Sequence, residues 1–427
     1  AAWKPLLPRG PLREAGTGEW LWTRTRASVS RFFTATLAAT IATAPLTAFT
    51  FNRITPLGVL ANLVVVPAVG WLVIPFGLVT AVAALVCQPA AVPLLRITSE
   101  GTQCVAAAAE AFARIPFASL RVGTPSLLEM AMCYLAFFAW FGARESPWRK
   151  RVVWVSLIVF GLSIASSILR NRSDPHLAIT FLAVGQGDSM LVEFPGGKRM
   201  IVDGGLERKG YQDAGRRIVS PFLGKRRICR LDYMVASHGQ ADHYGGLAFL
   251  ANDLDVGELW IGPKRGCEGE GYLKFLKLCR GNGIRIRRLC RGMRAFSVNG
   301  VEVEILNPPF TGKREGRGLA ECARGINDDS MVMRLTFGRV SVLLTGDIEG
   351  PAEKDLLADP NRVEAVLLKV PHHGSAASSG ETFLDAVEPG MAVVSAGYRN
   401  DFGFPSKEVV RRYRDRGILL YRTDLDG

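Results

Sequence analysis

The chain has 427 residues, 48% of them hydrophobic and 21% charged, and it carries a formal net charge of +13. This length excludes a single compact core, and the hydrophobic content is high for a wholly soluble protein. The positive charge favours an anionic partner, either nucleic acid or phospholipid head groups.

The apolar residues are concentrated in the first part of the chain. Residues 28–170 consist mainly of apolar runs, whereas the remainder has the mixed, charged composition of a globular domain. We therefore predict a membrane domain over residues 1–170 and a globular domain over residues 171–427. The sequence starts without Met and ends at "YRTDLDG", which reads as an unfinished strand or turn. We expect a fragment of a longer polypeptide, truncated at the C-terminal end of the globular domain.

Four apolar segments with few charges have the composition of membrane spans. They are residues 32–51, 57–87, 126–142 and 152–169. About 20 mostly apolar residues cross a bilayer. The alternative is a set of buried helices in a large soluble protein, but several such runs in succession favour a multi-pass protein of the inner (plasma) membrane.

Lysine and arginine in the short connections predict the orientation of these segments. The connection "ARESPWRKR" carries four basic residues and is expected in the cytoplasm. Residues 152–169 then run outward and place the globular domain on the periplasmic or extracellular side.

The same reasoning constrains the longest apolar segment. If residues 32–51 run outward and 126–142 run inward, both ends of 57–87 lie outside the membrane. This predicts a re-entrant hairpin broken at Pro67 and Pro75. The amphipathic segment 94–117 is expected to lie along the outer interface.

From about residue 176, short apolar or alternating segments separated by Gly-rich turns predict β-strands. Helical patterns are interleaved with them, at about 241–252, 272–281, 350–358, 380–387 and 405–416. Many strands with a few intervening helices predict an α/β sandwich.

Polar residues cluster where these strands end. Four of the five histidines fall in two motifs, His238 and His243 in "SHGQADH" and His372 and His373 in "VPHHGS". "VDGG" ends a strand before the first motif, and "LLTGD" ends another between the two. Each feature alone is weak evidence, since carboxylates beside Gly are common in turns, but the four in this order indicate a metal site.

Together these motifs resemble the metallo-β-lactamase fold. More narrowly, "FLAVGQGDSMLVEF", "SHGQADHYGGL", "LLTGDI" and "LKVPHHGS" are similar to the extracytoplasmic domain of the ComEC family of DNA-uptake proteins, and "PLGVLANLVVVPAVGWLVIPFGLV" is similar to that family's competence channel. The resemblance implies a multi-helix transmembrane domain followed by an αββα-sandwich domain. It also implies a channel for single-stranded DNA whose outer domain binds and hydrolyses the non-transported strand.

The resemblance further implies partners and site residues. The partners are single- and double-stranded DNA, other DNA-uptake machinery and the lipid bilayer, with a second copy of the chain as a further candidate. The candidate metal ligands are His238, Asp242, His243, Asp347, His372 and His373, of which one of the last two ligates. Asp242 and Asp347 are the candidate catalytic residues of a metal-dependent phosphodiesterase or nuclease. Asp203, Gln240, Asn327 and Ser375 are candidate supporting residues around the ligands. The cofactor is a divalent metal, Mn or Zn, as one or two ions.

Two positions depart from the family pattern. Gln240 stands where nucleases of the family tend to have Asp, and Phe404 stands where a His often precedes Pro. An uncharged amide is a poor ligand for a divalent ion, so we expect one complete metal site and one weakened site, which His238 would serve. Two alternatives follow: a catalytically degenerate DNA-binding module of the channel, and a membrane-tethered metallohydrolase of a small substrate.

Other segments have two interpretations. Asp188 or Ser189 in "VGQGDS" could contact phosphate, or the segment is a tight hairpin turn. The basic runs 216–230, 283–294 and 312–318 could follow a DNA backbone, or they are ordinary solvated surface.

Overall fold

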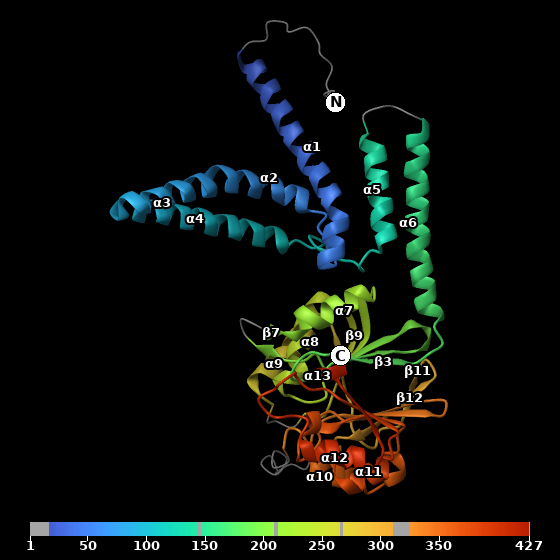
Figure 1. Cartoon of the computed structure of the whole chain (residues 1–427). Coiled ribbons are helices and arrows are strands. Elements are labelled where there is room, and N and C mark those ends of the chain that lie inside the picture. Colours follow the sequence, from blue (N-terminus) through green and yellow to red (C-terminus); the bar gives the residue numbers. More distant parts are fainter. Residues whose placement is uncertain (1–16, 143–146, 209–211, 265–267, 311–324, 427) are drawn as a thin grey trace. The chain divides into compact units, whose positions relative to one another are not determined.

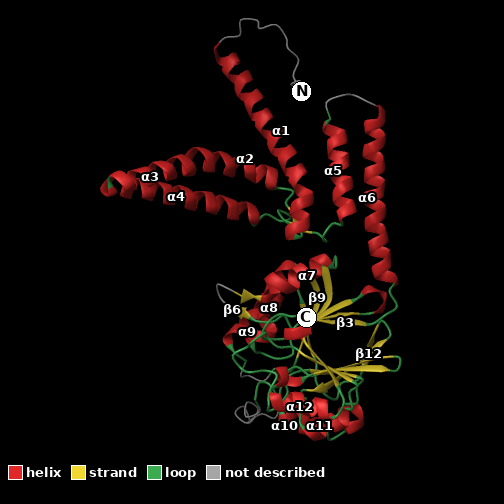
Figure 2. Cartoon of the chain, viewed as in Figure 1, coloured by secondary structure: helices red, strands yellow, loops and turns green. Residues whose placement is uncertain are grey.

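The computed structural model describes residues 17–142, 147–208, 212–264, 268–310 and 325–426. The chain separates into two compact units, residues 1–165 and 166–427. The first unit is mainly helical and the second contains the two large sheets, which confirms the predicted fold class (Figures 1 and 2).

Six helices make up most of the described part of the first unit. They are α1 (Thr17–Phe51), α2 (Gly58–Ala68), α3 (Ile74–Val86), α4 (Gln88–Ala113), α5 (Leu127–Phe141) and α6 (Pro147–Ser173). A short ladder of β1 (Arg53–Ile54) and β2 (Leu120–Arg121) joins the connections after α1 and α4.

Three helical segments among the described residues are long and apolar enough to cross a membrane: Arg26–Phe51, Gly58–Val86 and Pro147–Ser173. Only 6% of each apolar stretch is buried within the protein, so their side chains are left for lipid rather than for a protein core. The predicted span at 126–142 forms α5, whose 15 residues fall short of the usual spanning length.

The break predicted at Pro67 and Pro75 is wrong. α2 passes through a π-helical turn (Val69–Val73) into α3, and Gly58–Val86 is one continuous helical segment. A π-turn rearranges the hydrogen bonds locally and so accommodates prolines that cannot donate one. The chain reverses instead at Cys87, and α4 runs back along α3, where the hydroxyl oxygens of Thr80 and Thr98 lie 3.2 Å apart (Figure 1).

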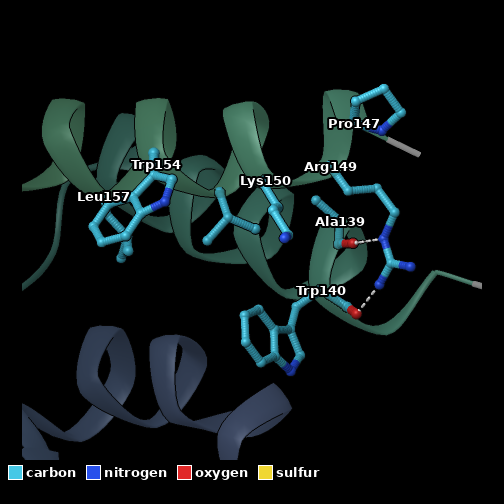
Figure 3. Close-up of a pocket in the computed structure, with 8 residues that line it drawn as sticks. Ala139, Trp140, Pro147, Arg149, Lys150, Trp154 and Leu157 are labelled. Carbon is cyan, nitrogen blue, oxygen red and sulfur yellow. Dashed lines mark hydrogen bonds between the residues drawn. The ribbon is translucent and has the colours of Figure 1, made fainter. Parts of the chain in front are cut away.

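Arg149 closes the C-terminal end of α5. Its Nε donates to the carbonyl oxygen of Ala139 at 2.6 Å, and its guanidinium also donates to the carbonyl of Trp140 (Figure 3). These carbonyls belong to the last turn of α5, which lacks partners within the helix and carries the negative end of the helix dipole. Arg149 also lines a cavity of about 980 Å³ together with Trp154 and Leu157 of α6.

Two sheets form the centre of the second unit (Figure 2). The six-stranded sheet has the order β10 (Arg285–Arg288), β9 (Asp255–Ile261), β8 (Arg230–Val235), β5 (Arg199–Val202), β4 (Met190–Glu193) and β3 (Ala178–Phe181). The seven-stranded sheet has the order β11 (Phe296–Val298), β12 (Val301–Asn307), β13 (Val332–Phe337), β14 (Val340–Leu344), β15 (Leu367–Lys369), β16 (Met391–Val394) and β17 (Leu419–Arg422). In each sheet an antiparallel part continues into a parallel part.

Helices cover the outer face of each sheet and complete the αββα sandwich. α7 (Ser220–Lys225), α8 (Ala241–Asp253) and α9 (Glu270–Gly281) pack on the six-stranded sheet; α10 (Gly350–Leu356), α11 (Glu381–Val387) and α12 (Lys407–Asp415) pack on the seven-stranded sheet. A third apolar cluster, which includes Val192, Val235 and Val303, lies between the sheets. The alternation along β12, where Val301 and Val303 are buried and Glu302 is exposed, is what a strand with one face on this core requires.

Parts of two of the predicted basic runs form regular secondary structure. Residues 285–288 form the edge strand β10, where the Arg287 guanidinium lies 4.5 Å from the ring centre of Phe296. Residues 215–225 form a π-helical turn and α7. The run 312–318 lies outside the described residues. DNA contact by any of these runs stays a prediction.

Candidate metal centre

Four side chains from three segments of the chain converge where strands end. Asp242 and His243 lie in the first turn of α8, Asp347 follows β14, and His373 follows β15. Each offers one ligand atom, and these atoms all lie within 4.8 Å of one another. β8, which precedes α8, belongs to the six-stranded sheet, whereas β14 and β15 belong to the seven-stranded sheet. The carboxyl ends of these strands lie at the same edge of the sandwich, which is why residues more than 100 positions apart in the chain meet here.

Hydrogen bonds to the Nδ1 atoms fix the orientation of the two imidazoles. His243 Nδ1 lies 2.9 Å from Asp203 Oδ2, and His373 Nδ1 lies 2.9 Å from the Ser395 carbonyl oxygen. With Nδ1–H donated in this way, both Nε2 atoms face Asp347 Oδ2, at 3.0 and 3.2 Å. Two nitrogen and two carboxylate donors with such support suit a divalent ion, and Zn or Mn accepts this mixture.

For the two imidazoles, pairing with carboxylates raises the pKa by more than burial lowers it. Burial lowers the pKa of His373, but Asp347 and Asp188 raise it overall to about 9. Burial likewise lowers the pKa of His243, yet Asp347 and Asp203 raise it well above its ordinary value. Protons on these imidazoles therefore balance the carboxylates in the metal-free protein, and a bound cation replaces them.

The pKa values of the two carboxylates in the cluster, Asp242 and Asp347, are lowered instead of raised. Burial raises the pKa of Asp242, but the hydrogen bond from His373 and the charge of His243 lower it overall to about 2. For Asp347, burial also raises the pKa, and His243, His373 and Lys369 together bring it well below its ordinary value. Both carboxylates are ionised at neutral pH, as metal ligands must be.

Lys369 completes the charge balance, although the sequence analysis did not single it out. It ends β15 with its side chain fully buried, and its Nζ donates to the Gly346 carbonyl at 2.7 Å. The same Nζ lies 3.3 Å from Asp347 Oδ1 and also pairs with Asp188. Asp347 is thus held by one oxygen and presents the other to the imidazoles. The sequence feature that could have identified Lys369 as a buried, paired residue is its place inside the apolar run "AVLLKV".

Asp188 does not reach a surface where phosphate could bind. Its side chain is fully buried between Lys369 and His373, with Oδ1 3.5 Å from His373 Nδ1. The backbone N–H of Asp188 donates to the carbonyl of Asp242 at 3.3 Å, and so ties "VGQGDS" to the first turn of α8. The phosphate-contacting interpretation of Asp188 is wrong.

His372 and His373 diverge. Only His373 joins the four-residue cluster among the described residues; His372 Nδ1 lies 2.9 Å from Glu349 Oε1. Both residues have positive φ, 46° and 53°, and this left-handed turn directs successive side chains apart. The backbone N–H of Ser375 closes the turn by donating to the His372 carbonyl at 2.8 Å.

Two neutral amides, Gln240 and Asn327, are hydrogen-bonded to each other near the four-residue cluster. Gln240 Nε2 donates to Asn327 Oδ1 at 2.5 Å, and Asn327 Nδ2 donates to Glu349 Oε1 at 3.0 Å. Glu349 therefore contacts both Asn327 and His372. The sequence did not point to Glu349 as part of the site; the feature that could have identified it is the second carboxylate in "TGDIEG".

His238 lies outside the four-residue cluster. Its ring centre is 4.2 Å from that of His243, and its Nδ1 is 3.0 Å from Ser237 Oγ. Burial, and then the charge of His243, lower the pKa of His238 to about 3, so it is neutral at physiological pH. Its buried Nε2 has no hydrogen-bond partner among the described residues. A ligand role for His238 stays a prediction.

A groove of about 720 Å³ reaches the cluster at Asp242. Gln240, Arg217, Tyr398 and Phe402 also line this groove. The cluster is thus accessible from a surface groove, as a substrate site requires.

The comparisons with known proteins agree with this architecture. Residues 182–398 match the metallo-beta-lactamase superfamily, and residues 9–147 match the competence protein family. ComE operon protein 3 of Bacillus subtilis (strain 168) is 29% identical over 260 residues, which cover 58% of this chain and 32% of that protein. Competence protein ComA of Neisseria gonorrhoeae is 31% identical over 251 residues, 58% of this chain and 31% of that protein.

A third relative, Recombination protein 2 of Haemophilus influenzae, is 28% identical over 279 residues, 65% of this chain and 32% of that protein. The chain spans about a third of the length of these relatives. The αββα sandwich, its converging ligands and the matched regions lead to one conclusion. The chain belongs to the metallo-beta-lactamase superfamily, and the region that precedes this domain matches the competence protein family, as the resemblance to the ComEC family predicts.

Proposed function

We propose that this chain is part of a membrane channel for the uptake of single-stranded DNA, and that its globular unit binds and hydrolyses the non-transported strand with a divalent metal ion. The observation that carries the proposal is the convergence of Asp242, His243, Asp347 and His373 beside a groove of about 720 Å³. The competence names of the relatives and the net charge of +13 support DNA as the substrate.

The residues of the cluster have distinct tasks in this proposal. His243, His373, Asp242 and Asp347 hold the metal ion. Asp203 and Ser395 keep the two imidazoles in place, and Lys369 keeps Asp347 in place. A divalent ion bound there supplies activation of water and polarisation of the phosphodiester. Gln240 and Asn327 add no charge on their side of the cluster, so the phosphate of the substrate meets less repulsion there.

The test uses the full chain in detergent with end-labelled single- and double-stranded DNA and added Mn²⁺, Mg²⁺ or Zn²⁺. We expect cleavage that stops with EDTA. Asp347→Asn and Asp242→Asn remove a ligand charge without changing shape, and we expect each to lower the rate by about 100-fold or more. Asp255→Asn is the matched control, because this carboxylate pairs with Arg230 on the surface.

The alternatives give other outcomes. Salt-sensitive DNA binding without product at any metal concentration indicates a non-catalytic DNA guide. Turnover of small chromogenic esters or lactams, without cleavage of DNA, indicates a small-substrate hydrolase. Equal cleavage by wild type, Asp347→Asn and Asp242→Asn contradicts the assignment of the metal centre.

A further inference from the structure

A series of stacked rings extends from His373, in the four-residue cluster, to the exposed ring of Phe402. The His373 and Phe404 rings are stacked with centres 6.4 Å apart and planes 29° apart. Phe404 in turn stacks on Phe402, with centres 5.6 Å apart and planes 18° apart. The side chain of Phe402 is 66% exposed. The series therefore ends in an aromatic ring that is open to a planar ligand.

This ring belongs to the groove that reaches the metal cluster. Phe402, Tyr398 and Arg217 line the groove together with Gln240 and Asp242. Tyr398 is 65% exposed, and the guanidinium of Arg399 lies 5.3 Å from its ring centre. Two exposed aromatic residues in one groove leave apolar surface in water, which is unfavourable unless a ligand covers it.

The loop that carries the rings is held by its own hydrogen bonds. Asn400 Oδ1 accepts from the backbone N–H of Phe404 at 2.9 Å, and Asn400 Nδ2 donates to the carbonyls of Phe404 and Gly397 at 2.6 and 2.9 Å. The rings are therefore positioned before a ligand arrives, so little conformational entropy is lost on binding.

We propose that Phe402, with Tyr398 beside it, is a stacking platform for a nucleobase of single-stranded DNA whose backbone continues towards the metal cluster. The proposal rests on the proposed function, because it takes DNA as the ligand of this groove. A nucleobase is flat and has a π-face, which matches the last ring of a stack, and stacking on aromatic side chains tolerates any base.

The charges of the groove suit a strand of DNA. Arg217 lines the groove and attracts phosphate, as would a divalent ion held beside Asp242. Asp213 and Asp401 line the groove as well, and these carboxylates repel phosphate while accepting hydrogen bonds from the amino groups of bases. Duplex DNA hides its base faces by stacking, so the platform selects an unpaired nucleotide at an end or in a single strand.

The test measures binding of the full chain in EDTA, so that no cleavage occurs. The probes are a fluorescent single-stranded oligonucleotide and the same strand with abasic sites. We expect the intact strand to bind more tightly. Phe402→Ala should weaken its binding by roughly 5- to 100-fold and leave the abasic strand unaffected, because stacking requires the base. Phe402→Trp should keep the affinity of the wild type.

Phe310→Ala is the matched control, since Phe310 is 72% exposed and lies outside the groove lining. Equal affinity of the wild type for intact and abasic strands overturns the proposal. So does a Phe402→Ala protein that binds both strands as the wild type does. If Phe402→Ala instead loses only its binding to anionic lipid vesicles, the platform contacts lipid and the proposal fails. Because binding is measured without a divalent ion, the platform can hold even if the proposed hydrolysis is not observed.

Discussion

At the residue scale, the cluster is a set of opposite charges that compensate one another out of water. Buried charges are costly unless they are paired, and here both oxygens of Asp347 have cationic neighbours: His243 and His373 face Oδ2, and Lys369 faces Oδ1. Lys369 keeps its charge permanently, because Asp188 and Asp347 raise its pKa although burial lowers it. The imidazole protons, in contrast, leave when a metal ion binds.

This arrangement predicts how the stability of the metal-free protein depends on pH. The folded-state pKa of His373 is raised to about 9, whereas a histidine in an unfolded chain has a pKa of about 6.5. The stabilisation is therefore fully present below pH 6.5 and is lost as the pH rises through about 9, with His243 acting in the same direction. The expected loss is on the order of 3 kcal/mol.

The measurement is the melting temperature in EDTA across this pH range, and then again with saturating Zn²⁺ or Mn²⁺. With metal bound we expect the decline to vanish, because the cation replaces the protons. Below pH 6.5, His238 acts in the opposite sense: its pKa of about 3 means that the unfolded chain takes up a proton that the folded protein does not. A melting temperature that rises from pH 6.5 to 9 in EDTA would falsify the charge assignment.

At the element scale, helix α8 positions two of the four cluster residues, and it is placed by close backbone contact. Gly204 N–H donates to the His243 carbonyl at 2.7 Å, and Gly246 N–H donates to the Gly205 carbonyl at 3.0 Å. A Cβ atom on Gly246 would collide with the carbonyl of Gly204 and lie 2.7 Å from the Gly215 backbone nitrogen. The glycine therefore sets the distance between α8 and the loop that carries Asp203.

We expect Gly246→Ala to push α8 outwards, to destabilise the fold by about 1–3 kcal/mol and to weaken metal binding. The control is Gly281→Ala at the end of α9, where an added Cβ meets nothing within 4 Å. Calorimetric titration with Zn²⁺ or Mn²⁺ and the melting temperature measure the two effects. Identical metal affinity in both variants would show that the ligands tolerate a shift of α8.

At the scale of the whole molecule, the two units meet different solvents. The helices of the first unit expose large apolar side chains such as Trp71 (86%) and Leu85 (88%), whereas the second unit buries its apolar residues in three clusters. The first pattern is stable only in a bilayer and the second in water.

The predicted orientation can be tested in cells by thiol labelling. In a chain whose eight native cysteines are replaced by serine, Arg339→Cys lies in the exposed turn between β13 and β14, and Lys150→Cys lies at the start of α6. We expect a membrane-impermeant maleimide to label position 339 in intact cells and position 150 only after permeabilisation, because basic connections stay in the cytoplasm. The reverse pattern would place the globular unit inside the cell.

The sequence by itself determined the properties that depend on near neighbours along the chain. Apolar run length separates a membrane unit from a globular unit, and periodicity predicts the strands and helices of the sandwich. The motifs "SHGQADH" and "LLTGD" identify Asp242, His243 and Asp347, because strand ends are where parallel sheets gather polar residues.

Only the tertiary structure decided which of these side chains meet and in which direction they point. His373 faces the cluster and His372 faces Glu349 because both have left-handed backbone angles, which two adjacent histidines in a sequence do not reveal. Lys369 holds Asp347, and Phe404 links His373 to the exposed ring of Phe402, through contacts between different loops. The physical reason is that charge pairing and ring stacking act over a few ångströms in space, whatever the separation along the chain.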